Sequence, residues 1–127
     1  MRKRSPLISV LLIALLIAIY FLKIKSSPST DTNSNLDRSI AHFIFTRHAR
    51  CRMDCRHIDE TEVKEILQKG TINYSKSQLN AKPDPKYALE GQTHDGQQVR
   101  IIFAPSNKGM VVITVIDLKE EWQCACN

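Results

Sequence analysis

The four cysteines of this 127-residue chain form two close pairs that lie far apart in the sequence. Cys51 and Cys55 are separated by one helical turn, and Cys124 and Cys126 are alternate residues near the end of the chain. Alternate residues of an extended segment point to the same side. Two sulfur atoms displayed by a helix could therefore meet two displayed by an extended tail. Such a contact would tie the end of the chain to an early helix, which restricts the fold strongly.

Three chemistries are compatible with these cysteines. Disulfides form and persist outside the cytosol, and bridges between the pairs are favoured because a bridge within one helical turn, Cys51 to Cys55, has poor geometry. A tetrahedral zinc site with four cysteine ligands is the alternative, although the spacing of Cys124 and Cys126 is tight for zinc. Free or redox-active thiols are the third chemistry, because His48 and nearby arginines would lower the thiol pKa values. The sequence favours disulfides and no cofactor, with zinc at the four cysteines as the alternative.

An uncharged apolar run from Leu7 to Leu22 follows the basic start MRKRSP, and Ser9 is its only polar residue. The run is somewhat short for a bilayer, which usually requires about 20 apolar residues. Lys23 and Lys25 follow it, where a cleaved signal peptide would end in small residues. We predict an uncleaved transmembrane anchor within residues 1–25. A cleaved signal segment and a buried core helix are the alternatives.

The distribution of basic residues around this run predicts its orientation. Arg2, Lys3 and Arg4 precede it, so the N-terminus is expected on the inside. A single-pass protein of the bacterial inner membrane would then expose its C-terminal domain to the periplasm. Residues 26–36 are predicted to form a flexible linker, and residues 37–127 a small domain.

The net charge of +5 comes entirely from the N-terminal segment, because residues from 26 onward contain equal numbers of basic and acidic side chains. A nucleic-acid-binding domain normally carries excess positive charge. The balance therefore weighs against a nucleic-acid partner and leaves the membrane and a protein or anionic partner.

Two helices are predicted before a β-rich region. The first covers residues 47–57, and the second begins with a capping box in which Asp59 is the N-cap and Glu62 the third helical residue. Gly70 is expected to end the second helix. Within the first helix, Ala49 and Met53 share one side, opposite the cysteines.

Three β-rich runs follow, separated by turn signals at Asp95-Gly96 and at residues 107–109. Short turns favour an antiparallel meander of three or four strands, so we expect an α+β domain with both helices packed on one face of the sheet. The predicted core, allowing for alternates in register, consists of Phe45, Val63, Ile66, Leu67, Leu89, Val99, Ile101, Phe103, Val112, Thr114 and Ile116.

The arginines of the first helix have two interpretations. They can solvate a helix face, with Arg50 paired to Asp54 one turn later. They can also form an anion-binding surface, joined by Arg100 from the sheet and by histidines as proton-transfer groups. The catalytic candidates under the second interpretation are His48, Arg50, Arg52 and Arg56. No established catalytic motif accompanies them.

The pattern His-Ala-Arg-x-Arg-Met, then Arg-x-Ile, a capped helix with Val-x-x-Ile-Leu, glycine and a meander resembles a bacterial family catalogued as domain of unknown function 4258. The resemblance covers Phe45 to Leu118, and the cysteine-rich ending Trp122–Cys126 looks like the form found in Bacteroidetes-type bacteria. The residues that carry it are His48, Ala49, Arg50, Arg52, Met53, Arg56, Ile58, Val63, Ile66, Leu67 and Gly70.

This resemblance implies a small α+β fold without an established activity. Its helix-then-sheet order is similar to that of RelE-like toxin ribonucleases, whose basic, histidine or tyrosine side chains lie on the sheet. The neutral charge, the anchor and the helical histidines depart from that pattern. We therefore expect a membrane-anchored, exported binding or structural module whose arginine-rich helix is the contact surface. A RelE-like ribonuclease and a zinc or thiol-redox domain are the alternatives, so the sequence weighs against an enzyme without excluding one.

Overall fold

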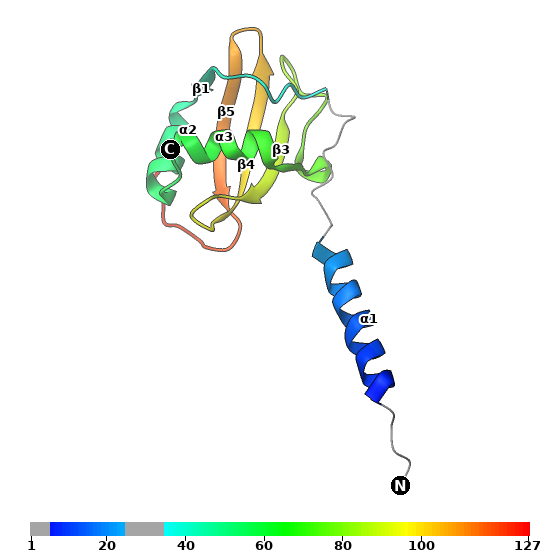
Figure 1. Cartoon of the computed structure of the whole chain (residues 1–127). Helices are drawn as coiled ribbons and strands as arrows, with labels where there is room; N and C mark the ends of the chain where they lie inside the picture. The colour runs from blue at the N-terminus through cyan, green and yellow to red at the C-terminus, as the bar shows by residue number, and fades with distance from the viewer. Residues whose placement is uncertain (1–5, 25–34) are drawn as a thin grey trace.

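The computed structural model describes residues 6–24 and 35–127 of the chain (Figure 1). The helices are α1 (Pro6–Ile24), α2 (Arg47–Arg56), α3 (Glu60–Lys69) and the short 3-10 helix η1 (Tyr74–Lys76). The strands are β1 (Phe43–Phe45), β2 (Thr71–Ile72), β3 (Tyr87–Gln92), β4 (Gln98–Ser106) and β5 (Gly109–Asp117). Both predicted helices and all three predicted β-rich runs are therefore confirmed, with α2 ending one residue early.

The strands form one five-stranded sheet in the order β1-β5-β4-β3-β2. The α+β class is confirmed, but the expectation of a purely antiparallel sheet of three or four strands was wrong. The edge strand β1 pairs with β5 in parallel, and the two strands are far apart in the chain, with no short turn between them. The other edge strand, β2, is only two residues long.

The helices α2 and α3 pack on one face of the sheet, where α3 crosses in front of the strands in Figure 1. Eight predicted core residues are buried, Phe45 is partly buried, and Val115 takes the place expected for Thr114 and Ile116. The cause is a β-bulge, since Ile102 pairs with Thr114 while the next residue of β4 pairs with Val112. The extra residue reverses the inward and outward alternation beyond it. The eight are Val63, Ile66, Leu67, Leu89, Val99, Ile101, Phe103 and Val112.

Gly70 ends α3 as expected, for a reason other than left-handed backbone. Its φ of −66° suits any residue, but a Cβ at this position would lie 2.5 Å from the carbonyl oxygen of Ile66. The helix end is completed from outside, because the Arg38 guanidinium donates to the carbonyl oxygens of Leu67 and Gly70 at 3.2 and 2.7 Å. Leu36 is buried as part of the core.

The apolar run is helical in α1, and its described apolar side chains are exposed. The transmembrane prediction for Leu7 to Leu22 is not confirmed, because no helix among the described residues combines the length and hydropathy needed to cross a bilayer. The physical reason is the shortness already visible in the sequence, where the uncharged run falls below about 20 residues. The predicted linker at residues 26–36 falls mostly outside the described residues.

Candidate functional site

The helix α2 is positioned by capping at both ends. The Thr46 hydroxyl accepts the backbone N–H of Ala49 at 3.0 Å and donates to the carbonyl oxygen of Ile113, the bulged residue of β5, at 3.0 Å. One side chain thus caps the helix and uses a carbonyl group that the bulge displaces from its ladder. At the other end His57 adopts a left-handed conformation with φ of 55°, and its N–H bonds to the last turn. His57 therefore forms the C-cap of α2.

The two faces of α2 divide as the helical wheel predicted. Ala49 and Met53 are buried against the sheet, and the cysteines on the other side form two disulfides to the tail. Cys51 is bonded to Cys126 and Cys55 to Cys124, so no described cysteine is free. The disulfide prediction is thus supported, and the alternative of zinc at the four cysteines is contradicted because their sulfurs bond to one another. In Figure 1 the C-terminus lies beside α2.

The unequal spacing of the two cysteine pairs follows from the geometry of their segments. Four residues along a helix advance about 6 Å, and two residues along an extended chain advance about 6.6 Å. The tail runs antiparallel to α2, and the Cα atoms within the two bridges are 5.7 and 5.9 Å apart. The Cys-x₃-Cys spacing of the helix and the Cys-x-Cys spacing of the tail therefore cover similar distances, so both disulfides can form side by side.

The start of the tail is held by Asp117, the last residue of β5. Its carboxylate accepts the backbone N–H groups of Lys119 and Glu120 at 2.8 and 3.0 Å and the indole N–H of Trp122 at 3.1 Å. The Trp122 ring meets the His57 ring edge to face, with centroids 5.5 Å apart. Burial alone would raise the pKa of Asp117, but the three N–H donors and a nearby arginine lower this pKa below its ordinary value.

That arginine is Arg56, which is buried rather than solvated. Its guanidinium donates to the carbonyl oxygen of Val115 at 2.6 Å, and its own carbonyl oxygen accepts from the Gln97 amide at 2.9 Å. Burial lowers the pKa of Arg56, and the neighbouring charge of Arg52 lowers it further, while Asp117 opposes both. Arg56 therefore fastens α2 to β5, and its burial leaves little of its guanidinium accessible to a partner.

Arg50 also differs from its expected role. It forms an ion pair with Glu60 at the start of α3 and lies over the Phe45 ring, 4.0 Å from the centroid. The predicted pairing with Asp54 was wrong, because the chain reverses after α2 and brings the first residue of α3 opposite Arg50. That contact bridges the two helices and could not be anticipated from spacing within one helix.

The remaining arginine and histidine candidates do not lie together in one site. His48 is exposed, and Arg52 is half-buried beside the disulfide-bonded face with no hydrogen-bond partner for its Nε atom. Arg100 lies on the sheet face opposite the helices and pairs with Glu90 at 2.6 Å. It therefore cannot join α2 in one anion-binding surface. The catalytic role of His48, Arg50, Arg52 and Arg56 stays an untested prediction.

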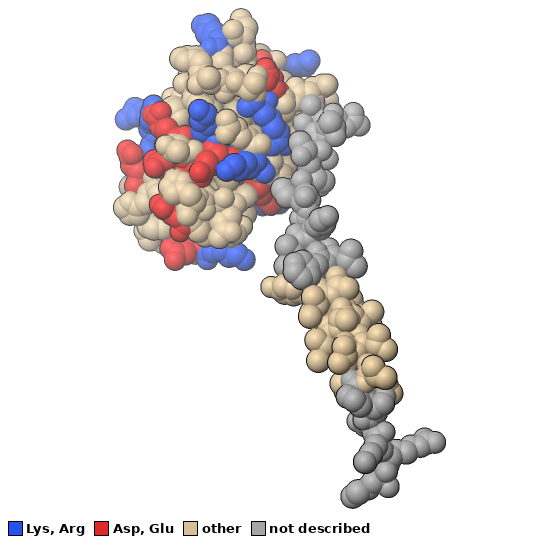
Figure 2. All heavy atoms as spheres, viewed as in Figure 1, with Lys and Arg blue, Asp and Glu red and all other residues tan. Residues whose placement is uncertain are grey.

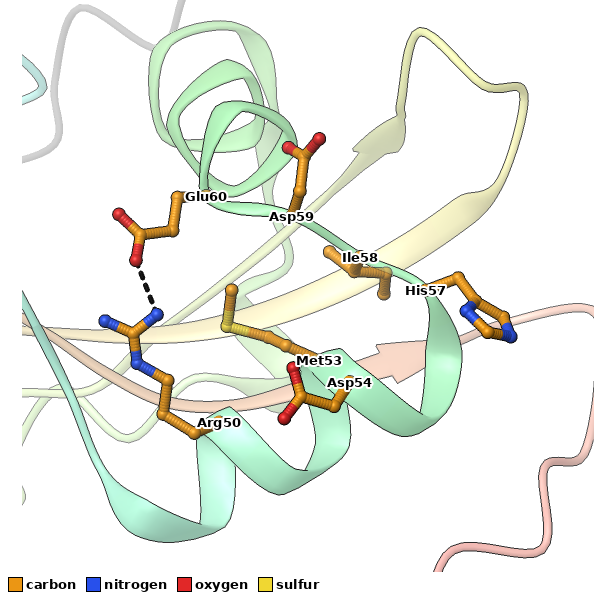
Figure 3. A pocket seen from close by; sticks show the side chains of 7 residues that line it. All are labelled: Arg50, Met53, Asp54, His57, Ile58, Asp59 and Glu60. Carbon is orange, nitrogen blue, oxygen red and sulfur yellow. Dashed lines mark hydrogen bonds and ion pairs between the residues drawn. The ribbon is translucent and has the colours of Figure 1, made fainter.

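A cleft of about 450 Å³ opens between the second half of α2 and the start of α3 (Figure 3). Met53 and Ile58, both of which belong to the core, contribute apolar surface, and the other side chains are polar. The complete lining is Arg50, Met53, Asp54, His57, Ile58, Asp59 and Glu60. Sequence reasoning singled out the capping box that begins at Asp59 but missed the cleft, which arises only when the two helices meet.

The cleft is acidic rather than basic. Its one arginine, Arg50, is neutralised by Glu60, which leaves Asp54 and Asp59 as the excess charges. On the face of α2 and α3 seen in Figure 2, basic and acidic side chains are intermingled without a large area of one sign. This pattern differs from the basic stripe typical of nucleic-acid-binding surfaces.

Comparison with known proteins identifies the core of the domain. The model of a family described as "Domain of unknown function (DUF4258)" matches residues 45–117. That stretch extends from the end of β1 to the end of β5, so it includes both helices and the cleft but not the cysteines of the tail. No curated protein and no solved structure matches the chain.

Removing the disulfides should produce a non-additive loss of stability. The first bridge to form closes a loop of about 70 residues, worth about 4 kcal/mol in the chain-entropy model, while the second closes a ring of only about eight residues, worth about 2.5 kcal/mol. C51S/C126S and C55S/C124S should each lower the free energy of unfolding by about 2.5 kcal/mol. The quadruple variant should lose more than the sum of both. Urea unfolding measures these free energies. Stability losses of the two double variants that add up to that of the quadruple variant would contradict the prediction for two adjacent disulfides.

The contribution of Asp117 should depend on pH. Because its pKa is lowered in the folded state, its stabilising effect is present above its ordinary pKa and is lost as the pH falls through the folded value. The difference in unfolding free energy between the wild type and D117N should therefore be largest near neutral pH and should shrink between about pH 5 and about pH 3.

Urea unfolding at a series of pH values measures this difference. D84N, which removes a carboxylate outside the tail contacts, serves as the matched control and should show a smaller difference. Parallel curves for the wild type and D117N would contradict the role assigned to this carboxylate.

Proposed function

Because the chain belongs to the DUF4258 family, which supplies no activity to transfer, we propose its function from the site: a disulfide-clasped binding module of an oxidising compartment. The single observation that carries this proposal is the fixation of α2 between the sheet and the disulfide-bonded tail. The cysteine-rich ending fits the proposed relation to the Bacteroidetes-type form.

The fixation of α2 supports a binding role through preorganisation. One face of α2 is held by Ala49, Met53 and Arg56 against the sheet, and another by Cys51 and Cys55 against the tail. The third face lines the cleft. A surface that is already ordered loses little conformational entropy when a partner binds. Covalent clamping of a short polar helix is thus better explained by a need for a fixed surface than by core packing alone.

The charge of the cleft indicates the partner. The expectation of an anionic partner rested on the arginines of α2, of which Arg56 is buried and Arg50 is paired. Asp54 and Asp59 instead favour a protein segment that brings a basic side chain. Opposite charges across an interface steer association and select partners.

The compartment is proposed from the disulfides and from α1. Structural disulfides persist in the periplasm or outside the cell and are rare in the cytosol. The exposed apolar side chains of α1 are typical of a segment that directs export. These features support the proposal that the domain lies on the outer side of the bacterial inner membrane.

The cleft is tested by titrating the ¹⁵N-labelled full chain, in a mild non-ionic detergent, with a trilysine peptide. The backbone amide signals of Asp54, His57 and Glu60 should shift, and triglutamate should leave them in place. D54N should weaken trilysine binding about two- to fivefold, the range expected for an exposed charge pair, whereas D84N should not. Equal affinity for the two peptides would reject the acidic-cleft proposal.

Export is tested by fusing alkaline phosphatase, which is active only outside the cytosol, after Asn127. The fusion should be active in cells, and L11R, which interrupts the apolar run of α1, should lower its activity strongly. L79R, the same substitution at an exposed leucine of the domain, should not. A fusion that is inactive while a fluorescent-protein fusion accumulates in the cytosol would overturn the proposed compartment.

A further inference from the structure

Three side chains with metal-binding atoms meet between α3 and the loop that joins β3 to β4. A carboxylate oxygen of Glu62, an imidazole nitrogen of His94 and a carboxylate oxygen of Asp95 all lie within 4.8 Å of one another. Glu62 comes from the first turn of α3, and the other two come from the hairpin loop, in which Gly96 has a φ of 88° that closes the turn. The cleft between α2 and α3 has none of these residues in its lining.

Glu62 gives the independent sign that this cluster is built for a ligand. Its side chain is only 1% exposed, and its Oε1 atom has no hydrogen-bond partner among the described residues. Its Oε2 atom accepts the backbone N–H of Asp59 at 3.0 Å, which completes the capping box. A buried carboxylate oxygen without a partner costs several kilocalories per mole unless a cation or donor satisfies it. The capping box therefore accounts for Oε2 of Glu62 but leaves Oε1 without a partner among the described residues.

His94 is oriented as metal-binding histidines usually are. Its Nδ1 atom lies 3.0 Å from Oε2 of Glu65, one turn along α3 from Glu62, and its Nε2 atom lies 3.5 Å from Oδ1 of Asp95. The backbone N–H of His94 also donates to Oε2 of Glu65 at 3.3 Å. A carboxylate on the far ring nitrogen fixes the ring and its tautomer, and this arrangement is common behind histidine ligands. Nε2 is then the nitrogen available to an ion.

We propose that Glu62, His94 and Asp95 bind a zinc ion, with Glu65 as the carboxylate that positions His94. One imidazole and two carboxylates suit zinc, whereas calcium and magnesium prefer oxygen ligands alone. Ligand atoms around tetrahedral zinc lie about 3.4 Å apart, so small rotations of the exposed His94 and Asp95 side chains complete the set. Three protein ligands leave a fourth position for water or for a donor from a partner.

Isothermal titration calorimetry of the oxidised full chain with zinc chloride, in a mild non-ionic detergent, tests the site. One ion should bind per chain, and H94A, D95N and E62Q should each weaken binding at least about tenfold. E62Q preserves a side-chain acceptor for the helix cap while removing the charge. E65Q should also weaken binding by about tenfold or more, because it disturbs the orientation of His94.

H48A and D84N are the matched controls, since each removes an imidazole or a carboxylate outside the cluster, and both should leave zinc binding unchanged. Circular dichroism checks the folding of every variant. If E62Q does not fold, H94A and D95N still test the site, because they change exposed residues. Absence of saturable binding, or binding that survives H94A and D95N, would overturn the proposal. Calcium binding as tight as zinc binding would overturn the choice of metal.

Discussion

The structure depends on the fixation of α2, a helix that cannot hold itself in place. It has ten residues, below the length at which isolated helices are stable. Only Ala49 and Met53 give it apolar side chains to bury, which contribute a few kilocalories per mole at most. The remaining anchors are polar or covalent: the buried Arg56 guanidinium on β5 and the two bridges to the tail. The position of α2 therefore depends more on these polar and covalent anchors than on buried apolar area.

One chain of polar contacts extends this fixation to the rest of the domain. The Gln97 amide donates to the carbonyl oxygen of Arg56 at 2.9 Å and lies 3.5 Å from Asp117, whose carboxylate holds Trp122 and the tail. These hydrogen bonds thus connect the end of α2 to the loop between β3 and β4, to the end of β5 and to the tail. Gln97 belongs to the same loop as His94. The contacts that hold the tail against α2 therefore also restrain the loop that carries His94 and Asp95.

Local features were predictable from the sequence, and features that depend on which segments meet were not. The capping box at Asp59, the turns and the opposed faces of α2 follow from spacing within a few residues. The parallel pairing of β1, the bulge at Ile113 and the Arg50–Glu60 contact need the packed fold. The cysteine spacing predicted bridges between the pairs, because a bridge within one helical turn has poor geometry. The cleft was not predicted from the sequence, because its two walls belong to different helices.

The start of α3 explains why acidic side chains occur on two sides of it. Carboxylates are favourable near a helix N-terminus because of the helix dipole, and Glu60 turns toward α2 while Glu62 turns toward the loop at His94. One helix end thereby contributes Asp59 and Glu60 to the cleft and Glu62 to the proposed metal site. The disulfides make the second use chemically consistent. The four cysteines, whose thiolates could otherwise bind zinc, are consumed by disulfide pairing, so a metal site in this domain has to rely on imidazole and carboxylate groups.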